Sequence, residues 1–309
     1  MKNLIKKLIN YIGNKNYKKS AEALFQNGSS HFITIRKNYP EIKDLNELDF
    51  KVFSQSGEDG IIDYLLHSLD VKVPKFVEIG VGDYKEANTR FLFERTNAKG
   101  LVIDCLENLK NKISKNLILW KGDLTIIEKL INAENIYSVL EKNGFNNKLD
   151  LLSLDVDGID YWILNSLPSN ISKIIVVEYN STFGSDLEIT VPNIPNFNRT
   201  NYHYSNLCFG ASLKAIIKLM KQKNYIFLGT SLSKINAFFI SKNELQKIKL
   251  NLPNENDLSE HVKSNIRESR SIDGKLSYLS GSDKIKAIKE CEVINLREKN
   301  SKPVKIKDI

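Results

Sequence analysis

The stretch Phe76-Val-Glu-Ile-Gly-Val-Gly-Asp83 decides the fold. Its apolar residues predict a short strand that is covered on both faces, as strands of a parallel sheet are. Gly80 and Gly82 follow at once, and glycines allow a tight turn and a close approach of the backbone to a bound molecule. We therefore expect a ligand at the carboxyl end of this strand.

A second apolar strand is predicted at Gly100–Asp104, and it ends in an acid. Asp104 lies about 20 residues after the glycines, the interval at which nucleotide-binding α/β folds present a carboxylate to ribose hydroxyls. The two strands therefore point at one nucleoside. A Gly-x-Gly turn alone is also an ordinary connection between a strand and a helix. The prediction of a nucleotide site therefore depends on the elements that flank the turn.

Helices and strands alternate along the rest of the central chain. We expect helices at 106–114, 124–143 and 210–220, strands at 117–120, 149–154 and 173–180, and an edge hairpin of strands 225–229 and 235–240. Asp123 is expected in a loop, and acids cluster after the strand that begins at Leu149. Strands separated by helices indicate βαβ units and a parallel sheet.

Composition places the chain among globular proteins. It has 309 residues, 41% of them hydrophobic and 27% charged, which suits one large domain or one such domain with an appendage. No run approaches 18 apolar residues, so no membrane-spanning helix is expected. The start lacks the apolar core and small-residue cleavage site of a signal peptide, which favours a cytoplasmic location.

Cysteine content and charge exclude other classes. Cys105, Cys208 and Cys291 are few and widely spaced, which indicates reduced thiols with no zinc site or disulfide framework. The net charge of +8 is spread without an Arg-rich block that carries aromatics, so we expect solvated faces and no nucleic-acid partner. A basic surface also suits an anionic substrate.

Three regions are expected. Residues 1–50 form a helical extension, 51–242 form the α/β domain with a long substrate loop at 181–210, and 243–309 form a C-terminal extension. Leu4, Ile5, Leu8, Ile9 and Ile12 share one face of a predicted helix at 2–13. This helix packs on its own domain or, as the alternative, makes weak peripheral contact with an anionic bilayer.

A helix start is predicted at Ser54–Asp59, just before the first strand. One interpretation is that its polar residues only cap the helix, whose dipole favours carboxylates there. The other is that Gln55 and Glu58 face the same cleft as the glycine turn.

Together these elements resemble the class I S-adenosylmethionine-dependent methyltransferase fold over residues 50–241. The motifs at 54–60, 78–83 and 154–158 look like FkbM-type and related sugar or polyketide O-methyltransferases. The tail at 267–281 looks like bacterial members associated with surface polysaccharides. The resemblance implies an α/β, Rossmann-like fold with a mostly parallel seven-stranded sheet and an antiparallel edge hairpin.

The resemblance also implies a cofactor site for S-adenosyl-L-methionine. Glu78, Gly80 and Gly82 match the motif that lies against the amino-acid and ribose portions, and Asp104 matches the acid that binds the ribose hydroxyls. The resemblance places Asp123 and Leu124 at the adenine edge. It places Asp155 or Asp157 opposite the methyl donor. Gln55 and Glu58 are expected in the same cleft.

Methyl transfer needs an aligned oxygen and removal of its proton, so a general base or a metal is required. Asp155, Asp157 and His203 are the candidates for catalysis. Asp157, Glu178 and Asn180 resemble the Mg²⁺ ligands of macrocin-type O-methyltransferases, although Asn180 stands where a carboxylate is expected. The alternative is that these acids cap helices or hold the amino group of the cofactor.

Substrate ligands are expected outside the sheet. Tyr202 and Tyr204 flank His203 in the long loop. Arg267 and Arg270 have the guanidinium groups to clamp a diphosphate or carboxylate, or else they pair with nearby acids such as Glu268.

The leading hypothesis is an S-adenosylmethionine-dependent O-methyltransferase that acts on a sugar, a nucleotide-activated sugar or a glycan precursor. A binding module that keeps the fold without activity, within surface-polysaccharide assembly, is one alternative. An NAD-dependent oxidoreductase is the other, but Lys85 and Glu86 stand where its third glycine is required. The oligomeric state is left open.

Overall fold

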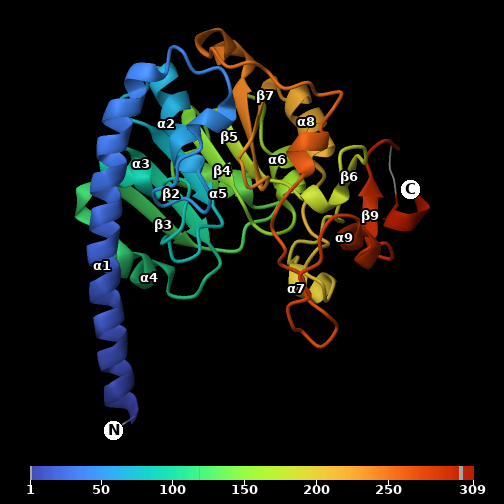
Figure 1. Cartoon of the computed structure of the whole chain (residues 1–309), viewed down its shortest axis with the longest axis horizontal. Coiled ribbons are helices and arrows are strands. Elements are labelled where there is room, and N and C mark those ends of the chain that lie inside the picture. The colour runs from blue at the N-terminus through green and yellow to red at the C-terminus, as the bar shows by residue number, and fades with distance from the viewer. Residues whose placement is uncertain (1, 118, 299–301) are drawn as a thin grey trace.

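The computed structural model describes residues 2–117, 119–298 and 302–309, with backbone only for 2–12, 14 and 121. A seven-stranded sheet in the order β3-β2-β1-β4-β5-β8-β7 forms its centre (Figure 1). Its strands are β1 (Lys75–Ile79), β2 (Lys99–Asp104), β3 (Asp123–Glu128), β4 (Leu149–Leu154), β5 (Ser172–Glu178), β7 (Tyr225–Thr230) and β8 (Asn236–Ser241).

The sheet is mostly parallel. β1 pairs in parallel with β2 and β4, β2 with β3, and β4 with β5, whereas β8 runs antiparallel to β5 and β7. The predicted fold is therefore confirmed: a class I, Rossmann-like methyltransferase fold with an antiparallel hairpin at one edge.

Helices cover the sheet and extend beyond it (Figure 1). They are α1 (Lys2–Ile35), α2 (Glu58–Ser68), α3 (Arg90–Arg95), α4 (Leu109–Asn116), α5 (Ile136–Lys142), α6 (Asp160–Ser166), α7 (Arg199–Tyr202), α8 (Leu213–Gln222) and α9 (Ser282–Ala287). None of the helices in the described ranges combines the length and the apolar character that crossing a bilayer requires.

The two faces of the central strands fill separate cores. Val77 of β1 and Leu152 of β4 pack into the core that also holds α5, α6 and α8. Phe76 and Leu151, which point to the other face, pack into the core that holds α2 and α4. Burial on both faces explains why these strands are continuous apolar runs in the sequence.

The region after α4 differs from the prediction. The expected strand at 117–120 and helix at 124–143 are wrong, because η3 (Leu119–Lys121) precedes strand β3, and α5 covers only residues 136–142. Ile118 lies outside the described residues. The segment pairs with β2, from Asp123 opposite Lys99 to Glu128 opposite Asp104. This pairing imposes the extended conformation on a segment whose apolar spacing fits a helix as well as a strand.

A second, three-stranded sheet joins the long loop to the C-terminal extension. It consists of β6 (Ile189–Thr190), β9 (Glu292–Asn295) and β10 (Val304–Lys305), with β9 in the middle. The loop at 181–210 therefore holds η4 (Ser181–Phe183), β6 and α7, elements too short to leave a periodic pattern. The C-terminal extension adds η5 (Lys242–Lys247), η6 (Ser259–Val262) and η7 (Ile306–Asp308). The exact domain boundaries remain predictions.

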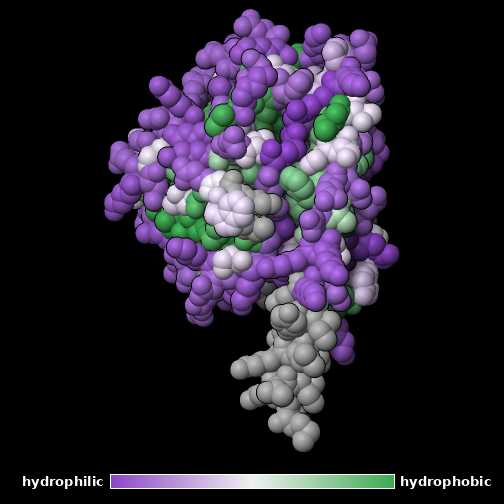
Figure 2. All heavy atoms as spheres, turned by 90° about the vertical axis from the view of Figure 1, so that its left-hand side faces the viewer, coloured by the Kyte–Doolittle hydropathy of each residue, from purple (hydrophilic) through white to green (hydrophobic). Residues whose placement is uncertain are grey.

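The N-terminal extension is helical, as expected, but α1 is far longer than 2–13. It runs along one side of the domain and its amino end reaches past it (Figure 1), before η1 (Arg36–Asn38) and η2 (Leu45–Leu48) lead into the sheet domain. The side chains of Leu4, Ile5, Leu8, Ile9 and Ile12 lie outside the described residues, so their packing or bilayer contact stays a prediction. Figure 2 shows the side that carries α1, where hydrophilic residues surround separate hydrophobic areas.

A buried ion cluster ties this extension to the domain. Asp63 of α2 has only 2% of its side chain exposed, and Arg36 bonds it through Nη2 at 2.6 Å and Nε at 2.9 Å. Tyr39 donates to the same carboxylate at 2.7 Å, and Arg95 of α3 pairs with it. One carboxylate therefore holds three segments together.

Asp63→Asn should lower the free energy of unfolding by roughly 2 to 3 kcal/mol, because it leaves two guanidinium groups without their counter-charge. Urea unfolding measures the loss. Asp70→Asn is the control: its carboxylate is 80% exposed in a surface pair with Lys72, so its loss should be much smaller than that of Asp63→Asn. Equal losses for the two variants would contradict the role of Asp63.

Candidate functional site

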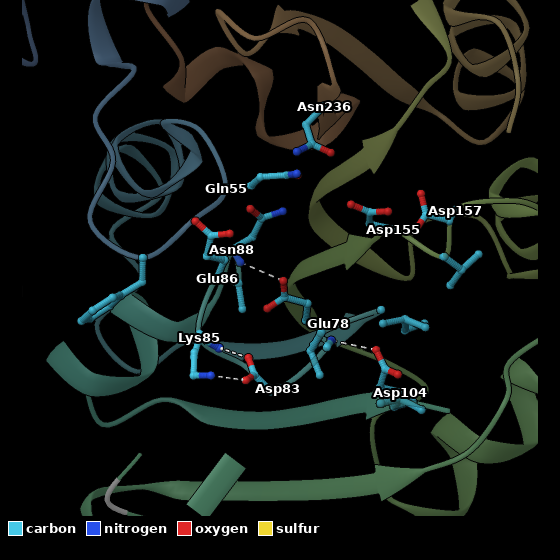
Figure 3. A pocket seen from close by; sticks show the side chains of 18 of the residues that line it. Gln55, Glu78, Asp83, Lys85, Glu86, Asn88, Asp104, Asp155, Asp157 and Asn236 are labelled. Carbon is cyan, nitrogen blue, oxygen red and sulfur yellow. Dashed lines mark hydrogen bonds and ion pairs between the residues drawn. The ribbon is translucent and has the colours of Figure 1, made fainter. Parts of the chain in front are cut away.

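A cavity of about 950 Å³ lies at the carboxyl ends of β1, β2 and β4. This large cavity is lined by Gly80 and Gly82 after β1, by Asp104 at the end of β2 and by Asp155 after β4 (Figure 3). Ligands of open α/β sheets bind at this edge, so the cavity is where the sequence predicts a ligand.

The two glycines have different roles. Gly80 has φ +87°, and a Cβ there would lie 1.5 Å from the carbonyl oxygen of Asp155. It is therefore glycine because the end of β1 packs against the end of β4, not because a ligand approaches it. A Cβ on Gly82, at φ +54°, would meet no atom within 4 Å, so its backbone is open to the large cavity.

Asp104 closes the glycine turn. One carboxylate oxygen accepts the backbone N–H of Gly82 at 2.8 Å (Figure 3). The other accepts that of Leu106 at 2.8 Å. The tips of β1 and β2 are thus held together beside the cavity, which brings together Gly82 and Asp104 as the sequence predicts.

Glu78 lines the large cavity from within β1 and is almost fully buried. Its carboxylate accepts the N–H of Asn88 at 2.8 Å, and the N–H and hydroxyl of Thr89 at 2.9 and 2.5 Å. Burial raises the pKa of Glu78 to about 7. The side chain therefore fixes the segment after the glycine turn.

Gln55 and Glu58 do not face the same cavity in the structure. Gln55 lines the large cavity, whereas Glu58 is fully buried and does not reach it. Glu58 accepts the N–H of Ser56 at 2.9 Å and the side-chain amide of Asn236 at 3.0 Å. The expectation that Glu58 contacts a cofactor is thus corrected: it positions Asn236, which lines the cavity and leaves its buried Oδ1 without a partner.

Asp123 and Leu124 do not reach the cavity either. They begin β3, at the amino end of the strand, where Asp123 lies 3.4 Å from Lys99. Residues 129–131, which follow β3 at its carboxyl end, line the cavity instead. The sequence predicts a strand at 117–120, which would put Asp123 and Leu124 in the loop at its carboxyl end. Because the strand is β3, these two residues lie at its amino end, and their assignment to the adenine edge is corrected.

Helix α1 supplies a wall that the sequence reasoning missed. Tyr17, Ser20, Ala21 and Leu24 line the large cavity. The buried Arg90 donates to the hydroxyl of Tyr17 and stacks 3.9 Å from the ring centre of Phe53, which fastens the helix there. No motif marks these residues, because they come from outside the sheet domain.

A small cavity of about 390 Å³ adjoins the large one. Gln55, Asp155 and Asp157 line both. The remaining lining comes from the end of β5, the long loop, the turn between β7 and β8 and the C-terminal extension, and includes Glu178, Asn180, Ser181, Thr182, Arg199, Asn206, Lys234, Ser264, Glu268 and Lys284. Polar side chains dominate this set.

Three carboxylates meet where the cavities join. One oxygen from each of Asp155, Asp157 and Glu178 lies within 4.8 Å of the other two. Burial, and then the charges of the neighbouring acids, raise the pKa of Asp155 and of Glu178 well above the usual range. Arg199 pairs with Asp157, and the buried Oε2 of Glu178 has no hydrogen-bond partner among the residues that the structure describes.

Asn180 is not part of this cluster. Its Oδ1 accepts the N–H of Thr182 at 2.9 Å, and its amide donates to the carbonyls of Leu207 and Phe209 at 2.8 and 2.9 Å. The side chain therefore shapes the wall of the small cavity. The structure therefore brings Asp155, and not Asn180, together with Asp157 and Glu178 of the predicted metal set.

The aromatic group of the long loop lies away from both cavities. The Nδ1 of His203 bonds the hydroxyl of Ser205 at 2.7 Å, Tyr202 donates to the carbonyl of Glu292 at 2.7 Å, and Tyr204 is exposed. Burial lowers the pKa of His203. The roles predicted for His203 as a base and for the two tyrosines as substrate ligands are corrected, since these three side chains line neither cavity, whereas Arg199 before them and Asn206 after them line the small one.

Arg267 and Arg270 also miss the cavities. Arg267 donates to the carbonyl of Tyr278 at 3.0 and 2.7 Å, and Arg270 lies 3.6 Å from Glu268. The expectation that they clamp a substrate is corrected. The guanidinium group that does line the small cavity is that of Arg199, which packs 4.3 Å from the ring centre of Phe209.

No family model and no curated protein matches the sequence. Among solved structures, it is similar to the N-terminal domain of EvdMO1 with SAH bound, at 10% identity and a TM-score of 0.39, over 61% of this chain and 80% of that one. It is also similar to an O-methyltransferase family protein from Burkholderia thailandensis (9%, 0.35, 60% and 58%). A third is PKMT2 from Rickettsia typhi in complex with AdoHcy (11%, 0.37, 58% and 53%). At this distance they carry no argument about activity, and the fold assignment rests on the strand order.

The raised pKa of Glu78 predicts a pH effect. Because the folded value of about 7 exceeds the ordinary 4.5, the contribution of this group to stability is complete below pH 4.5 and is lost as pH rises through 7. Relative to Glu78→Gln, the wild-type free energy of unfolding should fall by about 1 kcal/mol per pH unit across that window. Urea unfolding at several pH values measures it.

Glu86→Gln is the control, because that side chain is 64% exposed and pairs with Lys51 at the surface. Its stability should follow that of the wild type across the same window. A pH-independent difference between the wild type and Glu78→Gln would contradict the raised pKa.

Proposed function

We propose that this protein is an S-adenosylmethionine-dependent O-methyltransferase that binds the methyl donor in the large cavity and the acceptor in the small one. The observation that carries the proposal is the shared wall: Gln55, Asp155 and Asp157 line both cavities at the carboxyl ends of the parallel strands. Two adjoining sites are what a group transfer between two molecules requires, since it depends on holding both in alignment.

The residues of the large cavity fit the cofactor. Its volume lies in the range of cofactor sites, the backbone at Gly82 is open, and the Asp104 carboxylate lies beside it. The buried and unpartnered Oδ1 of Asn236 offers a hydrogen-bond acceptor in the wall. When bound, S-adenosylmethionine supplies a methyl group on a sulfonium, an electrophile that needs no further activation.

The carboxylates at the junction supply the base. A hydroxyl acceptor must lose its proton during the transfer, and a base is most effective when its pKa lies near the working pH. Burial and the neighbouring acids raise the pKa of Asp155, and Asp155 faces both cavities. We assign the proton transfer to Asp155, with Asp157 beside it.

The small cavity suits a polyhydroxylated acceptor. Its wall offers hydroxyls and amides from Ser181, Thr182, Asn206 and Gln55, groups that both donate and accept hydrogen bonds. A sugar, a nucleotide-activated sugar or a glycan precursor presents the matching hydroxyls. This acceptor class is also that of the FkbM-type enzymes that the sequence motifs resemble.

A divalent cation fits the cluster of Asp155, Asp157 and Glu178. Carboxylate oxygens are the ligands that Mg²⁺ prefers, and the unpartnered Oε2 of Glu178 lacks a cation or donor. A bound ion would lower the pKa of a coordinated acceptor hydroxyl. If the ion binds, it would occupy the carboxylate of Asp155, and the lowered pKa of the hydroxyl would then take the place of Asp155 as the means of releasing the proton.

The cofactor assignment is tested by calorimetry with S-adenosylhomocysteine. Asp104→Ala should weaken binding at least tenfold, because it removes the carboxylate that lines the cavity and holds Gly82. Asp123→Ala is the matched control at the amino end of the next strand and should bind as the wild type does. Binding of NAD in place of S-adenosylhomocysteine would overturn the proposal in favour of an oxidoreductase.

The metal assignment is tested by Mn²⁺ binding, followed by paramagnetic resonance. Glu178→Gln should weaken binding at least tenfold because it removes one of three carboxylates, whereas Glu268→Gln, in the same cavity but outside the cluster, should change it less than twofold. Equal binding by the wild type and Glu178→Gln would remove the metal from the proposal. A chelator added to the methylation of nucleotide-sugars by labelled donor then shows whether the ion assists the reaction.

A further inference from the structure

Three basic side chains line the small cavity: Arg199, Lys234 and Lys284. Arg199 is neutralised by Asp157. Within the described ranges, neither lysine forms an ion pair: Lys284 donates to the carbonyl of Ile266, and Lys234 lies 3.5 Å from the hydroxyl of Thr230. Asp44, Asp49 and Glu260 lie near enough to act electrostatically on Lys234, whereas no acid among the described residues acts in this way on Lys284.

Lys284 is the more unusual of the two, because only 8% of it is exposed. Burial lowers the pKa of Lys284, and the positive charge of the neighbouring Arg267 lowers it further. An ammonium group has three hydrogen-bond donors, of which the carbonyl of Ile266 takes one. A buried charge without a counter-charge is costly, so this position calls for an anion.

The carboxylates of the same cavity are engaged elsewhere. Asp157 pairs with Arg199, and one oxygen each of Asp155 and Glu178 lies within 4.8 Å of the other. Glu268 lies 3.6 Å from Arg270. None of these acids forms an ion pair with Lys284 in the part of the chain that the structure describes.

The wall also holds polar atoms that are buried without a partner. They are the Oε2 of Glu178, the Nε of Arg199 and the Oδ1 of Asn206. Buried polar groups are nearly always hydrogen-bonded, and a group that is not calls for an explanation such as a missing ligand. Two acceptors and one donor here match a ligand with several hydroxyls.

We propose that Lys284, together with Lys234, forms an anion subsite in the small cavity, and that the acceptor is a hydroxylated molecule that carries a phosphate or carboxylate group. The inference rests on the proposed function for the role of this ligand as the methyl acceptor. Lys284 comes from α9 in the C-terminal extension, so this extension recognises the acceptor while the ends of β4 and β5 hold the reacting hydroxyl.

Calorimetry of the full chain tests the subsite with three probes: inorganic pyrophosphate, glucuronate and neutral glucose. We expect pyrophosphate or glucuronate to bind at least tenfold more tightly than glucose, and the stronger of the two identifies the anionic group. Lys284→Met should weaken that binding at least tenfold. Lys286→Met, on the same helix with its side chain 69% exposed, should change it less than twofold.

Lys284→Arg keeps the charge and should retain binding to within about threefold, which separates loss of charge from loss of folding. Thermal unfolding of each variant is recorded alongside. Binding of both anions no tighter than glucose, or equal binding of them by the wild type and Lys284→Met, would overturn the subsite.

S-adenosylhomocysteine binding is measured on the same samples. It distinguishes failure of the anion subsite from failure of the proposed methyltransferase function. If S-adenosylhomocysteine binds and the anions do not, the subsite is wrong and the proposed function stands. If pyrophosphate binding depends on Lys284 but S-adenosylhomocysteine does not bind, the subsite stands and the methyltransferase proposal is wrong.

Discussion

The site depends on one backbone contact, the meeting of β1 and β4 at Gly80. Asp155 donates its N–H to the carbonyl of Ile79 at 3.0 Å, and the carbonyl of Asp155 occupies the space that a Cβ on residue 80 would need. This contact sets where the chain leaves β4, and so where the carboxylates of Asp155 and Asp157 stand. A side chain at residue 80 would push the glycine turn away from these acids and separate the two cavities.

Sequence reasoning recovered the sheet because burial on both faces leaves continuous apolar runs. It placed six of the seven strands and the meeting of Gly82 with Asp104, which follows from the rule that parallel strands end at one edge. It failed at β3, an edge strand that is only partly buried, whose isoleucines fit a helix as well as a strand. What placed that strand is pairing with β2, which no local pattern reveals.

The site residues also divide into those that the sequence predicts and those that it does not. Those that follow a strand directly, such as Asp104, Asp155 and Asp157, were found from the sequence. Arg199 and Lys284 were not, because they reach the small cavity through the long loop and the C-terminal extension, which the sheet of β6, β9 and β10 holds together. The imidazole of His203 has the chemistry of a base, but the turn after α7 directs it to the hydroxyl of Ser205 instead.

Helix α1 gives the molecule a property that the sheet alone lacks. Since residues between Tyr17 and Leu24 form part of the wall of the large cavity, whatever occupies that cavity touches both the helix and the sheet domain. Ligand binding and docking of the helix are therefore thermodynamically linked, and each strengthens the other. Removal of residues from the amino end would leave this wall whole until it reached Tyr17, and further shortening would expose the bound ligand to solvent.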